Sequence, residues 1–119
     1  MIDFALFEKE VMQRILAELP QYEAKLLCQY KHASVTERVF TGHGFYTHYD
    51  AIPPRYSLGE QLNLELGDLH ATLNGMEHGV GFCVFVRRGI ITCLEGYAYD
   101  EPWPESIELF SFFGDNHAL

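Results

Sequence analysis

Apolar residues recur at helical spacing near the N-terminus and at strand spacing along most of the remaining chain. The first stripe consists of Phe4, Phe7, Val11, Ile15 and Leu19, with Met12 and Leu16 beside them. The opposite side of the same segment is polar and carries Glu8, Lys9, Glu10, Gln13 and Arg14. With Asp3 as its N-cap, this pattern predicts a helix that runs through Glu18.

A second helix is predicted from Gln21 to about His32, directly after Pro20. Its apolar stripe is formed by Tyr22, Leu26 and Tyr30. Stripes of this kind indicate core packing rather than a cofactor site, and two helices suffice to cover one face of a sheet.

The stretch from Gly79 to Pro104 predicts a long β-hairpin around which the chain is organised. Strands over 82–86 and 90–99 are rich in β-branched and aromatic residues, and Arg87-Arg88-Gly89 forms the predicted three-residue turn. The expected pairs are Val86 with Ile90, Val84 with Thr92, and Cys83 with Cys93. A two-residue turn at Arg88-Gly89 is the alternative, and it would place Cys83 opposite Leu94.

Both faces of this hairpin are largely apolar, so we expect it in the middle of a sheet with both sides covered. One face carries Phe82, Val84, Val86, Ile90, Thr92 and Leu94. The other carries Cys83, Phe85, Ile91, Cys93, Glu95, Tyr97 and Tyr99.

The remaining strands are shorter or less regular. Residues 35–40 predict an edge strand, residues 45–49 a second strand, and residues 50–59, with Pro53-Pro54, a surface loop. Leucines alternate with polar residues over 62–66 and again over 69–73. A II′ turn at Gly67-Asp68 would pair Leu66 with Leu69 and set Glu65 opposite His70. The alternative is one long bulged strand.

The end of the chain carries one more apolar segment. Residues 107–113 are expected to form a last strand or a short helical turn, and residues 114–119 a frayed tail.

These elements indicate a single α+β domain over residues 1–119, with two N-terminal helices packed on a mostly antiparallel sheet of about five or six strands. The N-terminal residues do not show the pattern of a signal peptide, and no apolar run reaches the roughly 20 residues of a membrane span. Three cysteines without a C-x-x-C pair are expected to be reduced thiols. A cytoplasmic protein is therefore expected.

Charge is distributed unevenly around a net value of −9. Residues 1–55 hold seven acids and six bases, whereas residues 56–119 hold ten acids and two bases, Arg87 and Arg88. Such a surface disfavours nucleic-acid binding, which needs cations to replace phosphate counterions. It suits a solvated surface or a basic protein partner.

Motifs with established chemistry are not readable in this sequence: it has no P-loop, dinucleotide fingerprint, His-Glu-x-x-His or Gly-x-Ser-x-Gly. His43, His48 and Asp50 form the best metal candidate, with His70 or His78 as possible additions, but their spacing matches no specific site. No metal and no cofactor are therefore predicted. Glu95 lies in mid-strand and would act either as a structural acceptor or as a general acid or base.

Three segments resemble a group of small bacterial proteins without assigned activity. They are Thr41-Gly42-His43-Gly44-Phe45, then Gly79-Val80-Gly81-Phe82, then the run from Leu94 to Pro104. The group has segments similar to T-G-x-G-F and L-E-G-Y-x-Y-x-E-x-W-P, and the likeness covers about the last two thirds of this chain. It implies no catalytic residues. In size and charge the chain also resembles immunity proteins of toxin systems.

The function expected from the sequence is a non-catalytic, acidic protein-interaction module, immunity-like, that binds a basic partner. Its acidic interaction surface would consist of Asp100, Glu101, Glu105 and Glu108. The alternative is a small-molecule binder or enzyme around Glu95, His43 and the Pro53-Pro54 loop. Candidate binding residues are His43, Tyr46, Arg55, Glu95, Tyr97 and Trp103. A homodimer is also expected, because two helices leave one apolar sheet face to cover.

Overall fold

The computed structural model describes residues 1–113, and the tail predicted at 114–119 lies outside the described residues. Two helices precede six strands, which confirms the α+β class. The elements are α1 (Phe4–Leu16), α2 (Glu23–His32), β1 (Ser34–Phe40), β2 (Gly44–Asp50), the 3₁₀ turn η1 (Pro54–Tyr56), β3 (Leu64–Leu73), β4 (Val80–Arg87), β5 (Ile90–Ala98) and β6 (Phe110–Phe112).

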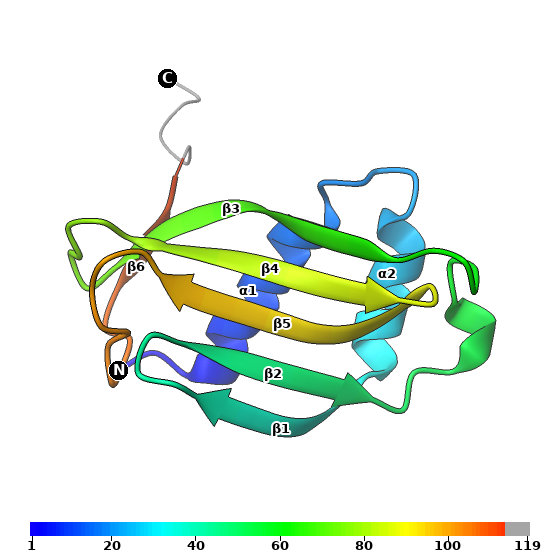
Figure 1. Ribbon diagram of the computed structural model, residues 1–119, viewed down its shortest axis with the longest axis horizontal. Helices are drawn as coiled ribbons and strands as arrows, with labels where there is room; N and C mark the ends of the chain where they lie inside the picture. Colours follow the sequence, from blue (N-terminus) through cyan, green and yellow to red (C-terminus); the bar gives the residue numbers. More distant parts are fainter. Residues whose placement is uncertain (114–119) are drawn as a thin grey trace.

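The strands form one antiparallel sheet in the order β1-β2-β5-β4-β3-β6. Figure 1 shows both helices behind this sheet, so the face toward the viewer carries no second layer. The hairpin of β4 and β5 lies in mid-sheet, as predicted, but residues 1–113 cover only one of its two sides, so the expected cover of the second side stays a prediction. The helical layer supplies cover on one side, and the second apolar face stays open.

Helix α1 begins as predicted, because the Asp3 carboxylate accepts a hydrogen bond from the Ala5 amide at 2.8 Å. Its apolar stripe packs on the sheet. The assignment of Glu8 to the polar side is wrong, since this residue is only 2% exposed and is buried together with Phe7 and Val11. Arg38 and Thr47 reach it from the sheet and bind its carboxylate.

Helix α2 is fixed to the tip of the β4–β5 hairpin by Gln29, which is fully buried. The Gln29 amide nitrogen donates to the carbonyls of Tyr56 and Gly89, each at 2.8 Å. Its carbonyl oxygen accepts from the Ile91 amide at 2.9 Å. One side chain thus joins α2, η1 and the hairpin.

The predicted register of the central hairpin is wrong. The turn is the two-residue alternative, because Arg87 pairs with Ile90 and both Arg88 and Gly89 have positive φ. A bulge between Phe85 and Val86 then shifts the pairing further, so that Cys83 lies opposite Glu95 instead of Cys93 or Leu94. Ile91 pairs with Val86 on the turn side of the bulge and faces the core, where it is 1% exposed, whereas Cys93 beyond the bulge faces the other side of the sheet.

The predicted hairpin at Gly67-Asp68 is also wrong, and the long bulged strand is the one observed. Leu66 pairs with Val84 and Leu69 with Phe82, so Gly67-Asp68 is an insertion within β3. Glu65 consequently lies opposite Phe85, and His70 opposite Gly81. The leucines nevertheless reach the helix side, where Leu66 and Leu73 are buried.

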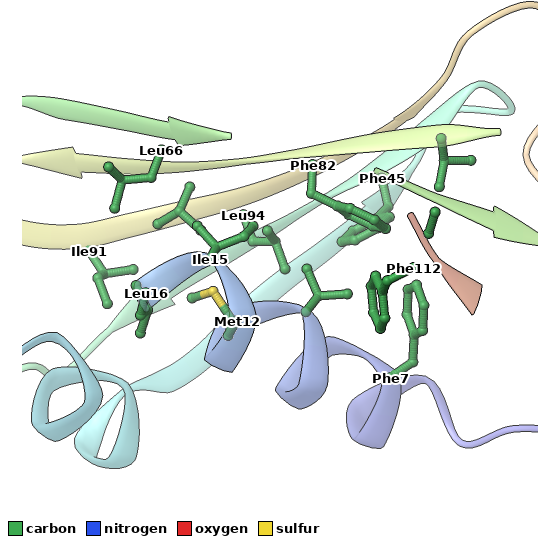
Figure 2. Packing of buried hydrophobic residues seen from close by; sticks show 14 of the residues in the cluster. Phe7, Met12, Ile15, Leu16, Phe45, Leu66, Phe82, Ile91, Leu94 and Phe112 are labelled. Carbon is green, nitrogen blue, oxygen red and sulfur yellow. The ribbon is translucent and has the colours of Figure 1, made fainter. Parts of the chain in front are cut away.

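The core lies between the helices and the sheet (Figure 2). Phe7, Met12 and Ile15 from α1 meet Phe82, Leu94 and Phe45 from the strands. Short β6 closes the far edge, where Phe112 is buried and Phe110 lies 5.1 Å from Phe7 between ring centroids. Among the described residues, no helix is long and apolar enough to cross a membrane.

Candidate interaction surface

The sheet face without helices is the candidate functional site, and we call it the open face. At its centre β2, β4 and β5 present alternate residues away from the helices, because successive side chains of a strand point to opposite sides. These residues are Tyr46, His48, Cys83, Phe85, Cys93, Glu95 and Tyr97. Apart from buried Cys93, each is partly exposed. The open face is therefore rich in aromatic side chains, with one carboxylate among them.

Glu95 occupies the middle of the open face. It pairs with Tyr46 across the β2–β5 ladder and with Cys83 across the β4–β5 ladder. A hydrogen bond to the Glu95 carboxylate raises the pKa of Tyr46, since the carboxylate stabilises the protonated phenol. Tyr46 also stacks near His48, with ring centroids 6.5 Å apart. Glu95 thus lies beside the ring of Tyr46, which is held by this hydrogen bond and by its contact with His48.

Aromatic contacts continue from Glu95 toward the loops at one end of the sheet. Tyr97 and Tyr99 form an edge-to-face pair with centroids 5.7 Å apart, and the Tyr99 hydroxyl contacts the ring nitrogen Nδ1 of His70. Exposed Phe113 lies 6.0 Å from the ring of His70. Burial raises the pKa of both Tyr97 and Tyr99, so these phenols remain protonated at neutral pH.

The thiols of the open face are free and poorly ionised. Burial, reinforced by nearby carboxylates, raises the pKa of Cys83 and brings the pKa of Cys93 to about 11. Since the thiolate is the nucleophilic form, neither cysteine has the environment of a catalytic thiol.

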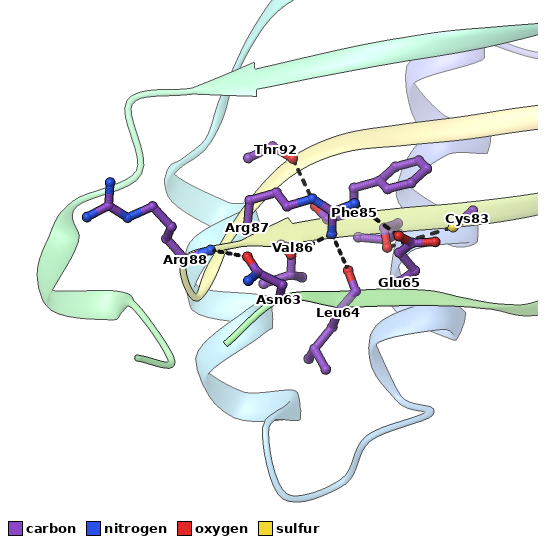
Figure 3. Close-up of polar contacts among 10 residues, drawn as sticks. Asn63, Leu64, Glu65, Cys83, Phe85, Val86, Arg87, Arg88 and Thr92 are labelled. Atoms are coloured by element: carbon purple, nitrogen blue, oxygen red, sulfur yellow. Dashed lines mark hydrogen bonds and ion pairs between the residues drawn. The ribbon is translucent and has the colours of Figure 1, made fainter. Parts of the chain in front are cut away.

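At the hairpin end, the cation of Arg87 is held by neighbouring groups (Figure 3). Its guanidinium donates to the Glu65 carboxylate at 3.0 Å and to the carbonyl of Leu64 at 3.2 Å. It also lies 5.3 Å from the ring centroid of Phe85. Arg88 lies 3.9 Å from Glu60. Both bases of the acidic half therefore have acidic partners at this end of the sheet.

Of the predicted binding residues, Tyr46, Glu95 and Tyr97 share the open face. His43 precedes β2 and Arg55 lies in η1 after it, so the strand separates them. The cavity beside His43, about 260 Å³, is lined by Ala98, Tyr99, Asp100, Glu101 and Pro102 and does not include Glu95. Trp103 is 8% exposed and packs on Phe45, so it serves the core.

The acids predicted as an interaction surface lie in the connection between β5 and β6. Glu101 accepts hydrogen bonds from the amides of Glu77 and His78, and these bonds lower its pKa. Glu108 forms an ion pair with the N-terminal amine at 3.1 Å. Asp100 and Glu105 are exposed beside them. Two of the four acids thus hold loops together, and the other two remain at the surface.

The predicted metal candidate does not assemble. Within residues 1–113 no three histidine, cysteine or acidic side chains gather with metal-ligand geometry. His48 lies on the open face, whereas the Asp50 carboxylate accepts from the Ala51 amide at 2.6 Å.

Sequence reasoning placed Phe85 and Cys93 on the same hairpin face as Glu95, as observed, but missed the contribution of His48 to that face. The period-two pattern of β5 does carry this signal for Cys93, Glu95 and Tyr97. The pairing of β2 with β5, which brings His48 opposite Cys93, joins segments distant in sequence and has no local signal.

Comparisons with protein-family models, curated proteins and solved structures found no match to this chain.

Proposed function

We propose that this chain is a non-catalytic protein-interaction module that binds a basic partner protein on its open face. The observation that carries the proposal is a sheet covered on one side, with tyrosine, histidine and phenylalanine side chains around Glu95 on the other. Tyrosine is enriched at interface centres, because its ring supplies contact area and its hydroxyl a hydrogen bond.

Charge supports a basic partner rather than a neutral one. The chain has a net charge of −9, and Glu65 and Glu60 already engage Arg87 and Arg88. Among residues 1–113, Glu95 has a hydrogen bond with Tyr46 and no ion pair with a basic side chain. A lysine or arginine of the partner could pair with Glu95 while lying over the rings of Tyr46 or Tyr97, which combines an ion pair with a cation–π contact.

The exposed acids Asp100 and Glu105 would raise the rate at which a basic partner associates with this chain. Asp100 directly follows Tyr99 in the β5–β6 connection, and Glu105 lies farther along it, near Phe40 and the N-terminal residues. Their field attracts a cationic protein and speeds its encounter. The effect weakens with salt, because the Debye length falls from about 10 Å at 0.1 M to about 3 Å at 1 M. The likeness to immunity proteins fits a partner of this kind.

The experiment is a comparison of association kinetics with a basic protein isolated by its binding to this chain. Glu95→Lys should abolish or strongly weaken the complex, while Asp100→Asn with Glu105→Gln should mainly slow association. Glu101 and Glu108 are left unchanged, because both hold the fold. Glu23→Lys, on α2 at the other side of the sheet, is the matched control. Equal binding by Glu95→Lys, or an association rate independent of salt, would contradict the proposal.

A homodimer through the same face is the second candidate. Its supporting observation is the apolar surface that the helices leave uncovered, including Phe85 and exposed Val39. A two-fold contact centred on Glu95 would, however, bring two carboxylates together without a cation. Sedimentation at tens of micromolar distinguishes the two: a 13.7 kDa species excludes the dimer. A species of twice that mass which Glu95→Lys abolishes would assign the open face to self-association.

The alternative of a small-molecule site around Glu95, His43 and the Pro53-Pro54 loop has less support. The cavity that includes Pro54 is lined by the hairpin tip, with Arg87 and Arg88, and does not include Glu95. His43 contributes to a different cavity. The three parts of that predicted site therefore do not share one cavity.

A further inference from the structure

A groove on the helix side of the molecule has the chemistry of a ligand site that is separate from the open face. It has a volume of about 690 Å³, which lies within the range of small-molecule sites. It lies where α1 and α2 meet the first hairpin of the sheet. Its lining residues are Ala5, Glu8, Lys9, Gln13, Leu27, Tyr30, Lys31, Ala33, Val35, Arg38 and Tyr49.

One end of the groove is formed by an ion pair between buried Glu8 and exposed Arg38. Glu8 accepts two hydrogen bonds from the Arg38 guanidinium, at 2.5 Å and 3.1 Å, and a third from the Thr47 hydroxyl. The carboxylate is thus both hydrogen-bonded and neutralised. Arg38 would therefore offset the repulsion between the Glu8 carboxylate and an anion bound in the groove.

The floor is aromatic and carries an unused hydroxyl. Tyr30 and Tyr49 meet edge to face with ring centroids 5.9 Å apart. The Tyr49 hydroxyl is buried and has no hydrogen-bond partner among the residues that the structure describes. Such a group costs stability unless something bonds to it. Because this oxygen has almost no accessible surface, a ligand acceptor would bond to it only after a movement of the side chains that cover it.

The rim is positively charged in a strongly acidic chain. Lys9 on α1 and Lys31 on α2 line opposite helices of the groove, and Glu8, its acid, is matched by Arg38. The two lysines therefore leave an excess of two positive charges. Most polar groups that line the groove are hydrogen-bond donors, whereas Leu27 and Val35 supply its aliphatic walls.

We propose that this groove binds a small organic anion in which a carboxylate is attached to a flat aromatic body. The body would lie against Tyr30 and Tyr49, between the aliphatic walls. The carboxylate would accept hydrogen bonds from the lysine ammonium groups, which are charge-assisted and stronger than neutral ones. A movement of the side chains that cover the Tyr49 hydroxyl would let it donate to the same carboxylate. This site does not depend on the open face or on a protein partner.

The test uses 2-naphthoate as the probe and its neutral amide, 2-naphthamide, as the matched control. Amide chemical shifts of the full chain are followed by NMR while each compound is titrated to millimolar concentration. Saturable shifts confined to α1, α2, β1 and β2 beside the groove, with the carboxylate binding more tightly than the amide, would support the site. Absence of saturation, equal binding of both compounds, or shifts centred on the open face would overturn it.

Variants test the individual groups. Lys9→Gln with Lys31→Gln should weaken 2-naphthoate binding by about fivefold to tenfold, because two partly screened charges are lost. Lys25→Gln removes an exposed lysine of α2 that does not line the groove and should leave binding unchanged. An equal loss in Lys25→Gln would show a general charge effect and overturn the assignment.

Tyr49→Phe separates a ligand role from a structural one. It should weaken 2-naphthoate binding while the unfolding midpoint in urea stays the same or rises, because the hydroxyl has no partner to lose. A marked drop in that midpoint would show that the hydroxyl is satisfied within the fold, which contradicts the proposed role. Unchanged binding would contradict it as well.

Discussion

The ring of Phe45, on β2, occupies the space where a side chain of Gly96, on β5, would lie. The two residues pair across the β2–β5 ladder, and a Cβ at Gly96 would overlap the Phe45 ring. Trp103 closes the same cluster, with its ring 5.2 Å from that of Phe45, and its amide donates to the Gly42 carbonyl at 2.9 Å. The T-G-x-G-F and L-E-G-Y segments thus pack against each other. Position 96 requires a glycine because the Phe45 ring fills the space that a side chain would need.

We expect Gly96→Ala to destabilise the protein by about 1–3 kcal/mol, because the new methyl group forces the Phe45 ring from its place. Urea unfolding of both proteins measures the change. Phe45→Leu removes the ring, so Gly96→Ala should cost less unfolding free energy in that background. The double variant should therefore be more stable than the sum of the two single effects implies. Strict additivity would mean that the two positions do not share this space.

Gln29→Leu is expected to cost about 2–5 kcal/mol of unfolding free energy, since three backbone groups lose their hydrogen bond to the side chain, although the Gly89 carbonyl still accepts from the Leu58 amide. Those groups are the Ile91 amide and the carbonyls of Tyr56 and Gly89. Gln21→Leu, at an exposed position before α2, is the control for the change of residue type. Equal midpoints for the two variants in urea would exclude this role of Gln29.

Leu73→Ala and Leu64→Ala should differ, although both leucines belong to β3. Leu73 is fully buried, so its truncation should cost about 2–5 kcal/mol through lost contacts and a cavity. Leu64 is partly exposed at the end of the strand, and we expect about half that loss. Urea melts of the two variants provide the comparison, and a larger loss at Leu64 would contradict the observed burial.

Stability should fall at alkaline pH through Cys93. Its pKa is about 11 in the folded chain, above the ordinary value of 9.0, so the unfolded chain loses the proton first. The contribution is complete below about pH 9 and is lost as pH rises toward about 11. Urea melts of the wild type and Cys93→Ala across that range measure it. A wild-type slope no steeper than that of the variant would contradict the raised pKa.

The local features of the fold were largely predictable from the sequence. Asp3 as N-cap, the two apolar helical stripes and the β-rich run from Phe82 to Tyr99 all depend on neighbouring residues, and the structure confirms each of them. Of the candidate site residues, Tyr46, Glu95 and Tyr97 came together.

Register and buried polar groups were not predictable in the same way. The two-residue turn and the bulge opposite Phe85 and Val86 each shift the pairing by one residue, so that Cys83 lies opposite Glu95. Beside the bulge, the Ile91 amide donates to Gln29, a contact across 62 residues that no local pattern reveals. The helical pattern places Glu8 on the polar side of α1 with Lys9 and Glu10, and carboxylates are seldom buried. Its partner Arg38 is 30 residues away on an edge strand, where no local pattern reveals it.

Strand β1 is an outer edge of the sheet and is exposed along its whole length, with Val35 and Val39 among its residues. An exposed edge invites another chain to extend the ladder. Here the register shifts between Val35 and Glu37, which interrupts the even row of free amides and carbonyls, and charged residues follow at 37 and 38. The chain thereby disfavours growth into open-ended strand assemblies, and contacts through the broad surface of the sheet remain compatible with a closed complex.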